Sequence, residues 1–387
     1  MGQRVPLFKI YWDEEDIASV SETIRQGMNW AAGPAVAEFE SRLADYVETK
    51  YAVTCNSGTS ALHMVIAACD VGPGDEVIVP SFTFIATANA PFFLGARPVF
   101  ADIEEKTFGL DAEDVERRIT PRTKAIMPIH FAGCPCRITE LKRVAEKHGL
   151  PLIEDAAEAL GALICGRKTG SIGDAAILSF CQNKVITTGE GGAVVTNSRE
   201  IYEKLRLVRS HGRQETHDYF ASSEAMDYIT LGYNFRMSTI TASLGLSQLR
   251  KVERLINLRR EKAAYLTSKL SAIEEISIPA TPDDSFHVYQ MYPVRIKGGK
   301  TVRDNLRDYL AGKGIASRVY FEPVHLTLFY RRKFGYRGGE LPVTERVSDE
   351  ILSLPMYPGI TRDDMDNVAG EVQAFFKKGF HGKYTGR

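Results

Sequence analysis

A turn suited to phosphate binding is the first candidate site in the sequence. Residues Asn56-Ser57-Gly58-Thr59-Ser60 follow a predicted strand and open the helical stretch 61–68. The first turn of a helix presents unpaired backbone N–H groups and the positive end of the helix dipole, and both attract phosphate. Gly58 lets the backbone approach closely, and the hydroxyls of Ser57 and Thr59 add donors. Taken alone, these residues are better explained as an ordinary helix cap, because Ser and Thr favour that position.

Two further candidates lie at the ends of later predicted strands. Glu154-Asp155 closes the strand PLIED, and the carboxyl ends of parallel strands face the crevice in which α/β proteins bind ligands. Lys184 lies between the strand AILSF and the glycine-rich turn TTGEGG. A lysine in such a pocket can lose its proton and attack a carbonyl. Taken singly, a helix-capping role explains the carboxylate equally well, and a solvated surface charge explains the lysine better.

The three candidates are more informative together than singly. A phosphate-binding turn, a carboxylate at a strand end and a lysine 29 residues later (184 − 155) are what pyridoxal phosphate requires. The lysine forms the Schiff base, and the carboxylate keeps the pyridine nitrogen protonated so that the ring can accept electrons. The turn anchors the 5′-phosphate. The sequence therefore predicts a pyridoxal phosphate site.

An alternation of short apolar runs and helical stretches must position these residues. Runs rich in β-branched residues occur at residues 51–55, 76–80, 98–102, 124–130, 151–155, 176–180 and 192–196. Several of them are apolar nearly throughout, as strands buried on both faces are. Amphipathic stretches such as 112–119 and 138–148 lie between them. The pattern predicts an α/β fold with a largely parallel sheet.

Beyond about residue 238 the alternation of short apolar runs and helical stretches ends. Leucines at helical spacing predict one long helix that continues to residue 270. A strand-like segment (287–296), a helix (302–313) and loops with many Gly and Pro residues follow. We therefore expect a large domain at residues 1–250 and a smaller α+β domain at residues 251–387. The first 30 residues or so, with a capped helix that opens at Asp13, are expected to pack on the smaller domain.

Composition excludes several classes of protein. The 387 residues include 48 basic and 49 acidic ones, a net charge of −1, so no global field attracts nucleic acid or anionic lipid. No apolar stretch reaches the roughly 18 residues that span a membrane, and the N-terminus does not read as a signal peptide. Six cysteines in a chain of this length do not make a disulfide framework. We expect reduced thiols, no metal site and a cytoplasmic location.

The chain resembles the fold-type I sugar aminotransferases of the DegT/DnrJ/EryC1/StrS family, from about residue 5 to residue 330. The matching segments are GPAVAEFE (33–40), NSGTSALH (56–63), PGDEVIVPSFTFIATANA (73–90), TKAIMPIHFAG (123–133), IEDAAEALGA (153–162), SFCQNKVITTGEGGAVVT (179–196) and GYNFRMSTITASLGLSQL (232–249). The resemblance implies an aspartate-aminotransferase-like fold, with a mostly parallel seven-stranded sheet in the large domain. EDAAEA together with NK-ITTGEGG is most similar to the branch that aminates C4 of nucleotide-linked 4-keto-6-deoxyhexoses, as perosamine synthases do.

The resemblance also assigns roles to residues of the cofactor site. Lys184 matches the lysine that forms the Schiff base and shuttles the proton, and Asp155 matches the carboxylate that pairs with the pyridine nitrogen. Phe84 occupies the position of the aromatic residue that stacks on the ring. The phosphate contacts correspond to Gly58, Thr59 and Ser179, together with Asn234, which in the family reaches the phosphate of the neighbouring subunit. The resemblance therefore implies a homodimer with shared active sites.

Three further positions are assigned more loosely. Glu158 stands where many family members carry Gln or His near the ring hydroxyl, and we assign it to cofactor contact. A carboxylate beside a phenolate oxygen is repelled unless it is protonated or bonded to a donor. His325 matches a histidine near the sugar, and Arg236 is assigned with it to substrate binding. A buried histidine with satisfied nitrogens and an arginine at a surface turn are the structural alternatives.

The predicted reaction is transfer of an amino group from L-glutamate to the keto carbon, C4 by resemblance, of a nucleotide-diphosphate 4-keto-6-deoxyhexose. Aminocyclitol aminotransferases and aminohydroxybenzoate synthases share the lysine, so these activities stay open. Sugar 3-dehydratases of the same family carry His in place of the lysine, and Lys184 argues against that branch. A regulatory protein with a vestigial site is the alternative from another class.

Overall fold

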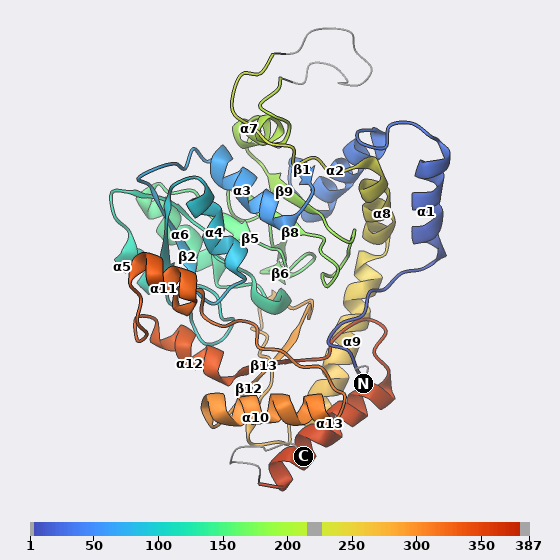
Figure 1. The fold of residues 1–387 in the computed structure, drawn as a ribbon, viewed down its shortest axis with the longest axis vertical. Coiled ribbons are helices and arrows are strands. Elements are labelled where there is room, and N and C mark those ends of the chain that lie inside the picture. Colours follow the sequence, from blue (N-terminus) through green and yellow to red (C-terminus); the bar gives the residue numbers. More distant parts are fainter. Residues whose placement is uncertain (1–3, 215–226, 380–387) are drawn as a thin grey trace.

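Seven strands form one mixed sheet in the computed structural model, which describes residues 4–214 and 227–379 (Figure 1). Two hydrogen-bonded sets, β3-β2-β4 and β5-β8-β9-β1, are joined where Ile126 pairs with Leu152 and Ile129 with Asp155. The strands are β1 (Tyr51–Cys55), β2 (Glu76–Pro80), β3 (Arg97–Ala101), β4 (Thr123–Ile126), β5 (Ile153–Asp155), β8 (Ala175–Ser179) and β9 (Gly192–Thr196). The predicted seven-stranded sheet is confirmed.

The direction of the strands decides which residues meet. β9 runs antiparallel to both neighbours, β8 and β1, whereas β5 pairs parallel with β8 and β2 pairs parallel with β3 and β4. The carboxyl ends of β1, β5 and β8 therefore lie at one edge of the sheet. The chain turns back at this edge between β8 and β9, and the turn carries Lys184. All three candidates from the sequence thus reach the same edge, where α/β proteins bind ligands.

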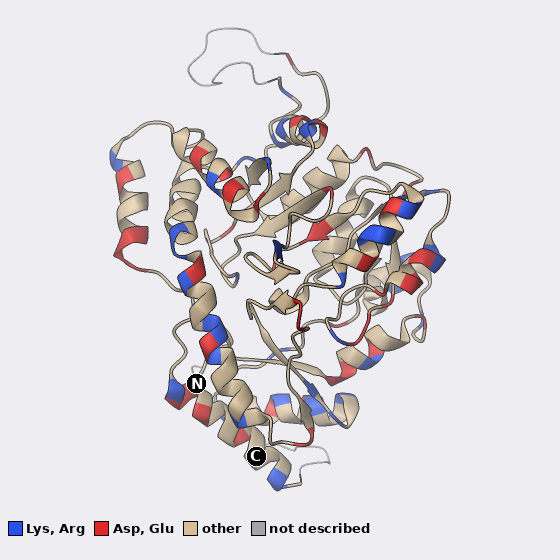
Figure 2. Ribbon diagram, turned by 180° about the vertical axis from the view of Figure 1, so that it is seen from behind, with Lys and Arg blue, Asp and Glu red and all other residues tan. Residues whose placement is uncertain are grey.

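Helices cover both faces of this sheet. α3 (Gly58–Ala68), α4 (Ile85–Phe93) and α7 (Arg199–Arg209) pack on one face, and α2 (Pro34–Val47) and α8 (Thr239–Arg250) pack on the other. α5 (Ala112–Arg118) and α6 (Ile138–His148) complete the cover beside β4. Charged residues are frequent along the helices that cover the sheet (Figure 2). Both faces of the strands are therefore buried, which explains their nearly continuous apolar sequence.

A second, smaller sheet lies below the first in Figure 1. Its antiparallel strands are β10 (Ile276–Ser277), β12 (Tyr292–Ile296) and β13 (Ile351–Leu354). They share a hydrophobic core with α9 (Val252–Leu270), α10 (Gly299–Gly312) and α13 (Arg362–Lys377). Val5 pairs with Ile315 in this unit, whereas α1 (Glu14–Arg25) lies along α8. The domain boundary at residue 250 stays a prediction.

Shorter elements connect the two units. A three-stranded ribbon consists of β6 (Leu163–Ile164), β7 (Arg167–Lys168) and β11 (Ser285–Phe286). The helical segments η1 (Phe131–Gly133), η2 (Val324–Leu326), α11 (Leu328–Phe334) and α12 (Pro342–Glu350) complete the described elements. All six cysteines are free, as expected. Among the residues that the structure describes, no helix is long and apolar enough to cross a membrane.

The single long helix predicted from residue 238 is wrong in one respect. The helix is interrupted at Lys251, whose φ of −111° and ψ of 10° leave the helical region, so α8 and α9 are separate elements. The Lys251 side chain is buried and contacts the carboxylates of Asp13 and Asp16 at the start of α1. Because Asp13 and Asp16 are distant from Lys251 in the sequence, the spacing of the leucines does not reveal this interruption.

Candidate functional site

The predicted phosphate-binding turn is packed directly against the end of β8. Ser57 caps α3 by accepting a hydrogen bond from the N–H of Ser60 at 3.0 Å. A Cβ atom on Gly58 would lie 2.9 Å from Cβ of Ser179, closer than real side-chain contacts allow. Glycine is therefore required there, and it brings the first turn of α3 and Ser179 together. Thr59 is exposed in that first turn, so the structure presents donors suited to an anion.

Asp155 is buried at the end of β5 and has two donors within the protein. Its Oδ2 accepts a hydrogen bond from the hydroxyl of Thr87 at 2.8 Å, and its Oδ1 accepts one from the N–H of Ala157 at 3.2 Å. Thr83 bonds in turn to Thr87 at 2.8 Å. Burial raises the pKa of Asp155, although these donors and the positive charge of Lys184 oppose the rise. A carboxylate has about four acceptor positions, so it can still pair with a cationic ligand.

Lys184 and Glu158 form an ion pair in the interior of the site. Their Nζ and Oε1 atoms are 3.3 Å apart, and the side chains are only 14% and 12% exposed. The other carboxylate oxygen of Glu158 accepts a hydrogen bond from the N–H of Ala132 at 2.8 Å. The amine is therefore held in place, largely shielded from water, at the same edge of the sheet as Asp155.

Phe84 presents an aromatic ring at the start of α4. It is the N-cap residue of α4, the helix that carries Thr87, and its side chain is 61% exposed. Its nearest aromatic neighbour, Phe321, is 6.5 Å away between ring centroids. An aromatic face that the protein leaves largely uncovered is available for stacking on a planar ligand.

The side chains and backbone groups of this edge fit pyridoxal phosphate. The glycine-lined turn can hold a phosphate, the buried carboxylate can hold a pyridinium, the exposed ring can stack, and the shielded amine can bond an aldehyde. Gly58 is the residue most specific to this fit, because any side chain there would fill the space against Ser179.

The segment that carries Asn234 and Arg236 lies beside the same turn. The N–H of Asn56 donates to the carbonyl of Phe235 at 2.8 Å, and the Asn56 side chain donates to the carbonyl of Asn234 at 3.4 Å. The Asn234 side chain is exposed. Arg236 donates to the hydroxyl of Ser210 at 3.2 Å. Contacts of Asn234 with a second subunit and of Arg236 with substrate stay predictions.

His325 has the bonding pattern of a structural histidine. Its ring is fully buried, with Nδ1 2.7 Å from the hydroxyl of Ser81 and Nε2 3.2 Å from a carboxylate oxygen of Glu345. Burial lowers its pKa, although Glu345 favours the charged form. Because both nitrogens are engaged, the structure favours the alternative of a satisfied buried histidine. A contact between His325 and a sugar stays a prediction.

The adjacent carboxylates Glu154 and Asp155 have different surroundings. Glu154 is fully buried and accepts hydrogen bonds from Nε2 of His130 at 2.9 Å and from three backbone N–H groups in the loop before β8. Burial opposes its ionisation, but these donors outweigh burial and lower the pKa of Glu154. Successive strand residues point to opposite faces, so Glu154 fastens the loop while Asp155 faces the site.

Thr87, Thr83 and Ala132 are residues of the site that the sequence analysis did not single out. The two threonines lie in the segment 73–90 that carries the family resemblance, four residues apart at the start of α4. Thr83 precedes the N-cap residue Phe84, so the two are not an i, i+4 pair within α4, and their place in this segment is the only signal. Ala132 donates through its backbone, so its side chain gives no signal.

Comparison with known proteins identifies the family of this chain. The model of the DegT/DnrJ/EryC1/StrS aminotransferase family matches residues 11–373. The chain belongs to this family. A relative in Caulobacter vibrioides named GDP-perosamine synthase is 41% identical over 340 residues, which cover 87% of this chain and 89% of the relative.

Solved structures of similar proteins agree with the fold. DesV from S. venezuelae matches with a TM-score of 0.87 and 34% identity, over 96% of this chain and 98% of its own. The putative sugar aminotransferase Spr1654 from Streptococcus pneumoniae, in its PMP-form, matches with a TM-score of 0.91 and 29% identity, over 97% and 98%. This chain is therefore a pyridoxal-phosphate-dependent aminotransferase with a fold-type I architecture.

Proposed function

We propose that this aminotransferase moves an amino group from L-glutamate to C4 of a nucleotide-diphosphate 4-keto-6-deoxyhexose. The observation that carries the proposal is the shielded Lys184 amine at the same sheet edge as the buried Asp155 carboxylate and the Gly58 turn. The similarity to a protein named GDP-perosamine synthase supports a sugar-nucleotide substrate.

Each residue would have a distinct task in this reaction. When bound, pyridoxal phosphate supplies an electron sink for the carbanion that forms at the amino-acid α-carbon. Lys184 would bond the aldehyde carbon and, once released, use Nζ to move a proton from glutamate and later to the sugar carbon. Asp155 would keep the pyridine nitrogen protonated, and Phe84 would hold the ring by stacking. Glu158 would bind the lysine ammonium whenever the amine is free.

The remaining assignments concern the phosphate and the substrate. Gly58, Thr59 and Ser179 would hold the cofactor phosphate through the first turn of α3 and the end of β8. We propose that Asn234 completes the phosphate site of a second subunit in a homodimer, since its side chain is exposed beside the turn. Arg236 is the proposed substrate contact.

The visible absorption of the purified protein, before and after excess L-glutamate, tests the first half of the proposal. A yellow lysine-bound band should be present and should be lost with glutamate. Lys184→Ala and Lys184→Arg should lack the response, whereas Lys147→Ala, which removes a 67% exposed lysine, should retain it. A response that survives in Lys184→Ala would overturn the assignment of the lysine.

A panel of nucleotide-linked keto-sugars tests the second half. Recovery of the yellow band identifies an accepted sugar, and NMR of the product distinguishes amination at C4 from amination at C3. Activity with an aminocyclitol precursor but with no keto-sugar would favour that alternative substrate. A response to glutamine but not to glutamate would replace the donor and leave the rest of the proposal in place.

A further inference from the structure

The backbone that carries Lys184 is held by two buried side chains from outside the large sheet. Gln290, just before β12, donates from its amide to the carbonyl of Asn183 at 2.9 Å. Arg259, on α9, donates from Nη2 to the carbonyl of Lys184 at 3.5 Å. The N–H of Lys184 donates to the carbonyl of Cys181 at 3.0 Å. The peptide groups next to the lysine are therefore bonded from several sides.

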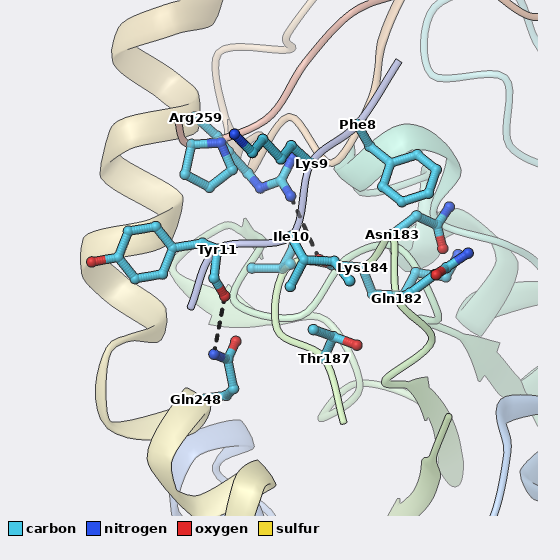
Figure 3. A pocket seen from close by; sticks show the side chains of 12 residues that line it. Phe8, Lys9, Ile10, Tyr11, Gln182, Asn183, Lys184, Thr187, Gln248 and Arg259 are labelled. Carbon is cyan, nitrogen blue, oxygen red and sulfur yellow. Dashed lines mark hydrogen bonds between the residues drawn. The ribbon is translucent and has the colours of Figure 1, made fainter. Parts of the chain in front are cut away.

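Arg259 also joins other segments to this point. Its Nη1 donates to the carbonyl of Gln290 at 3.2 Å and to the carbonyl of Met356 at 3.3 Å. Figure 3 shows Arg259 reaching from α9 toward the Lys184 turn, close to the N-terminal segment that carries Phe8 to Tyr11. The guanidinium of Arg259 thus connects α9, the segment before β12 and the segment after β13 to the turn that carries Lys184.

This arrangement is poorly suited to stability alone. Arg259 is 3% exposed, and burial lowers its pKa to about 10, so it stays charged at neutral pH. No carboxylate in the described part of the chain compensates this charge, and Nε of Arg259 and Oε1 of Gln290 have no hydrogen-bond partner there. Burying an uncompensated charge is costly, whereas an apolar side chain would avoid that cost. A role of this charge in holding the Lys184 segment therefore explains it better than a contribution to the stability of the fold.

We propose that Arg259 and Gln290 are positioning residues that fix the backbone of Lys184 for its reaction with the cofactor. This inference rests on the proposed function of Lys184. Because Nζ is attached to this backbone, a shift of the backbone changes the positions that Nζ can reach. A displacement of about 1 Å in a reacting group can reduce the rate roughly 100-fold. Both side chains come from the part of the chain beyond residue 250 and contact the lysine segment through its backbone carbonyls.

The experiment uses apoenzyme reconstituted with pyridoxal phosphate, and it compares Arg259→Met, Arg259→Lys and Gln290→Met with a matched control. Arg303→Met is that control, because Arg303 is also fully buried and donates to two backbone carbonyls, those of Ser348 and Ile351. For each variant we would measure the thermal midpoint, the rate at which the yellow band appears, the pH midpoint of that band, and the rate of its loss with L-glutamate.

For Arg259→Met we expect slower formation of the yellow band, a shifted pH midpoint and a half-reaction roughly 100-fold slower, with little change in the glutamate concentration at half-saturation. Arg259→Lys and Gln290→Met should show smaller effects in the same direction. Arg303→Met should lower the thermal midpoint and leave the spectral properties of the lysine unchanged.

Two results would overturn the inference. Wild-type formation and pH dependence of the band in Arg259→Met would make Arg259 a purely structural residue, as would spectral changes of equal size in Arg303→Met. If Arg259→Met does not fold, the same comparison is made with Arg259→Lys and Gln290→Met. Failure of the proposed function is distinguishable, because the wild-type protein would then form no band or show no response to glutamate.

Discussion

The hydroxyl of Thr87 offers a direct test of how the protein controls the Asp155 carboxylate. Thr87→Val keeps the shape of a buried side chain but removes the donor that lies 2.8 Å from Oδ2 of Asp155. A hydrogen bond to a charged group contributes about 1.5–3 kcal/mol, and one pKa unit corresponds to about 1.36 kcal/mol. We therefore expect the pKa of Asp155, which burial already raises, to rise further in Thr87→Val.

A carboxylate with a higher pKa is more basic and competes better with the pyridine nitrogen for the proton, so less of the bound cofactor would carry a protonated ring. If the same free energy is lost in the transition state, the half-reaction with L-glutamate should slow roughly 10- to 100-fold. Stopped-flow absorbance at saturating glutamate measures this rate, and its pH profile should move to higher pH at the acidic limb. Thr83→Val should have a smaller effect, because Thr83 reaches Asp155 only through Thr87.

Thr344→Val is the matched control for Thr87→Val. The Thr344 hydroxyl is also buried but has no hydrogen-bond partner among the residues that the structure describes. Removing it should change neither the rate nor the pH profile. A wild-type rate and an unshifted profile in Thr87→Val would refute the reasoning, because the bond would then not govern the charge of Asp155.

Three other predictions concern single side chains. Burial raises the pKa of Asp155, so its ionised form destabilises the fold at neutral pH. Asp155→Asn should therefore raise the thermal midpoint of the apoenzyme at pH 7, and this gain should disappear below about pH 3.9. The same substitution should abolish the half-reaction with L-glutamate. Glu154 is the opposite case, because its lowered pKa contributes stability above about pH 4.3 that is lost on acidification. Glu154→Gln should therefore cost about 3 kcal/mol of unfolding free energy at pH 7, measured by urea denaturation at several pH values. Phe84→Ala should raise the dissociation constant of the cofactor roughly 3- to 10-fold and leave apoenzyme stability unchanged, since the ring is 61% exposed.

The sheet was predictable from sequence because its strands are buried on both faces. The apolar runs at 51–55, 76–80 and 192–196 coincide with β1, β2 and β9. The run predicted at 124–130 is shorter, since β4 ends at Ile126 and only the single pair Ile129–Asp155 continues the ladder. Pro128 lacks the N–H that a ladder residue donates, which accounts for the early end.

The partners of the predicted site residues were not predictable in the same way. Asp155 and Thr87 are 68 residues apart, and Lys184 and Arg259 are 75 apart. No local period or motif connects such pairs, because tertiary packing alone brings them together. His325 illustrates the converse: the motif indicates a substrate contact, whereas Ser81, 244 residues away, occupies one of its nitrogens.

The architecture separates control of the two groups proposed to react with the cofactor. Asp155 ends a parallel strand and accepts a hydrogen bond from Thr87 on α4, so elements of the large domain fix its position and stabilise its charge. Lys184 lies on the turn into the antiparallel strand β9 and is held by Arg259 and Gln290, from α9 and the segment before β12. A shift of the second unit would therefore move the lysine backbone while leaving the carboxylate in place. Because an aminotransferase must release its lysine when substrate binds and recover it afterwards, a backbone fixed by Arg259 and Gln290 would return Nζ to the same place while Asp155 keeps the cofactor oriented.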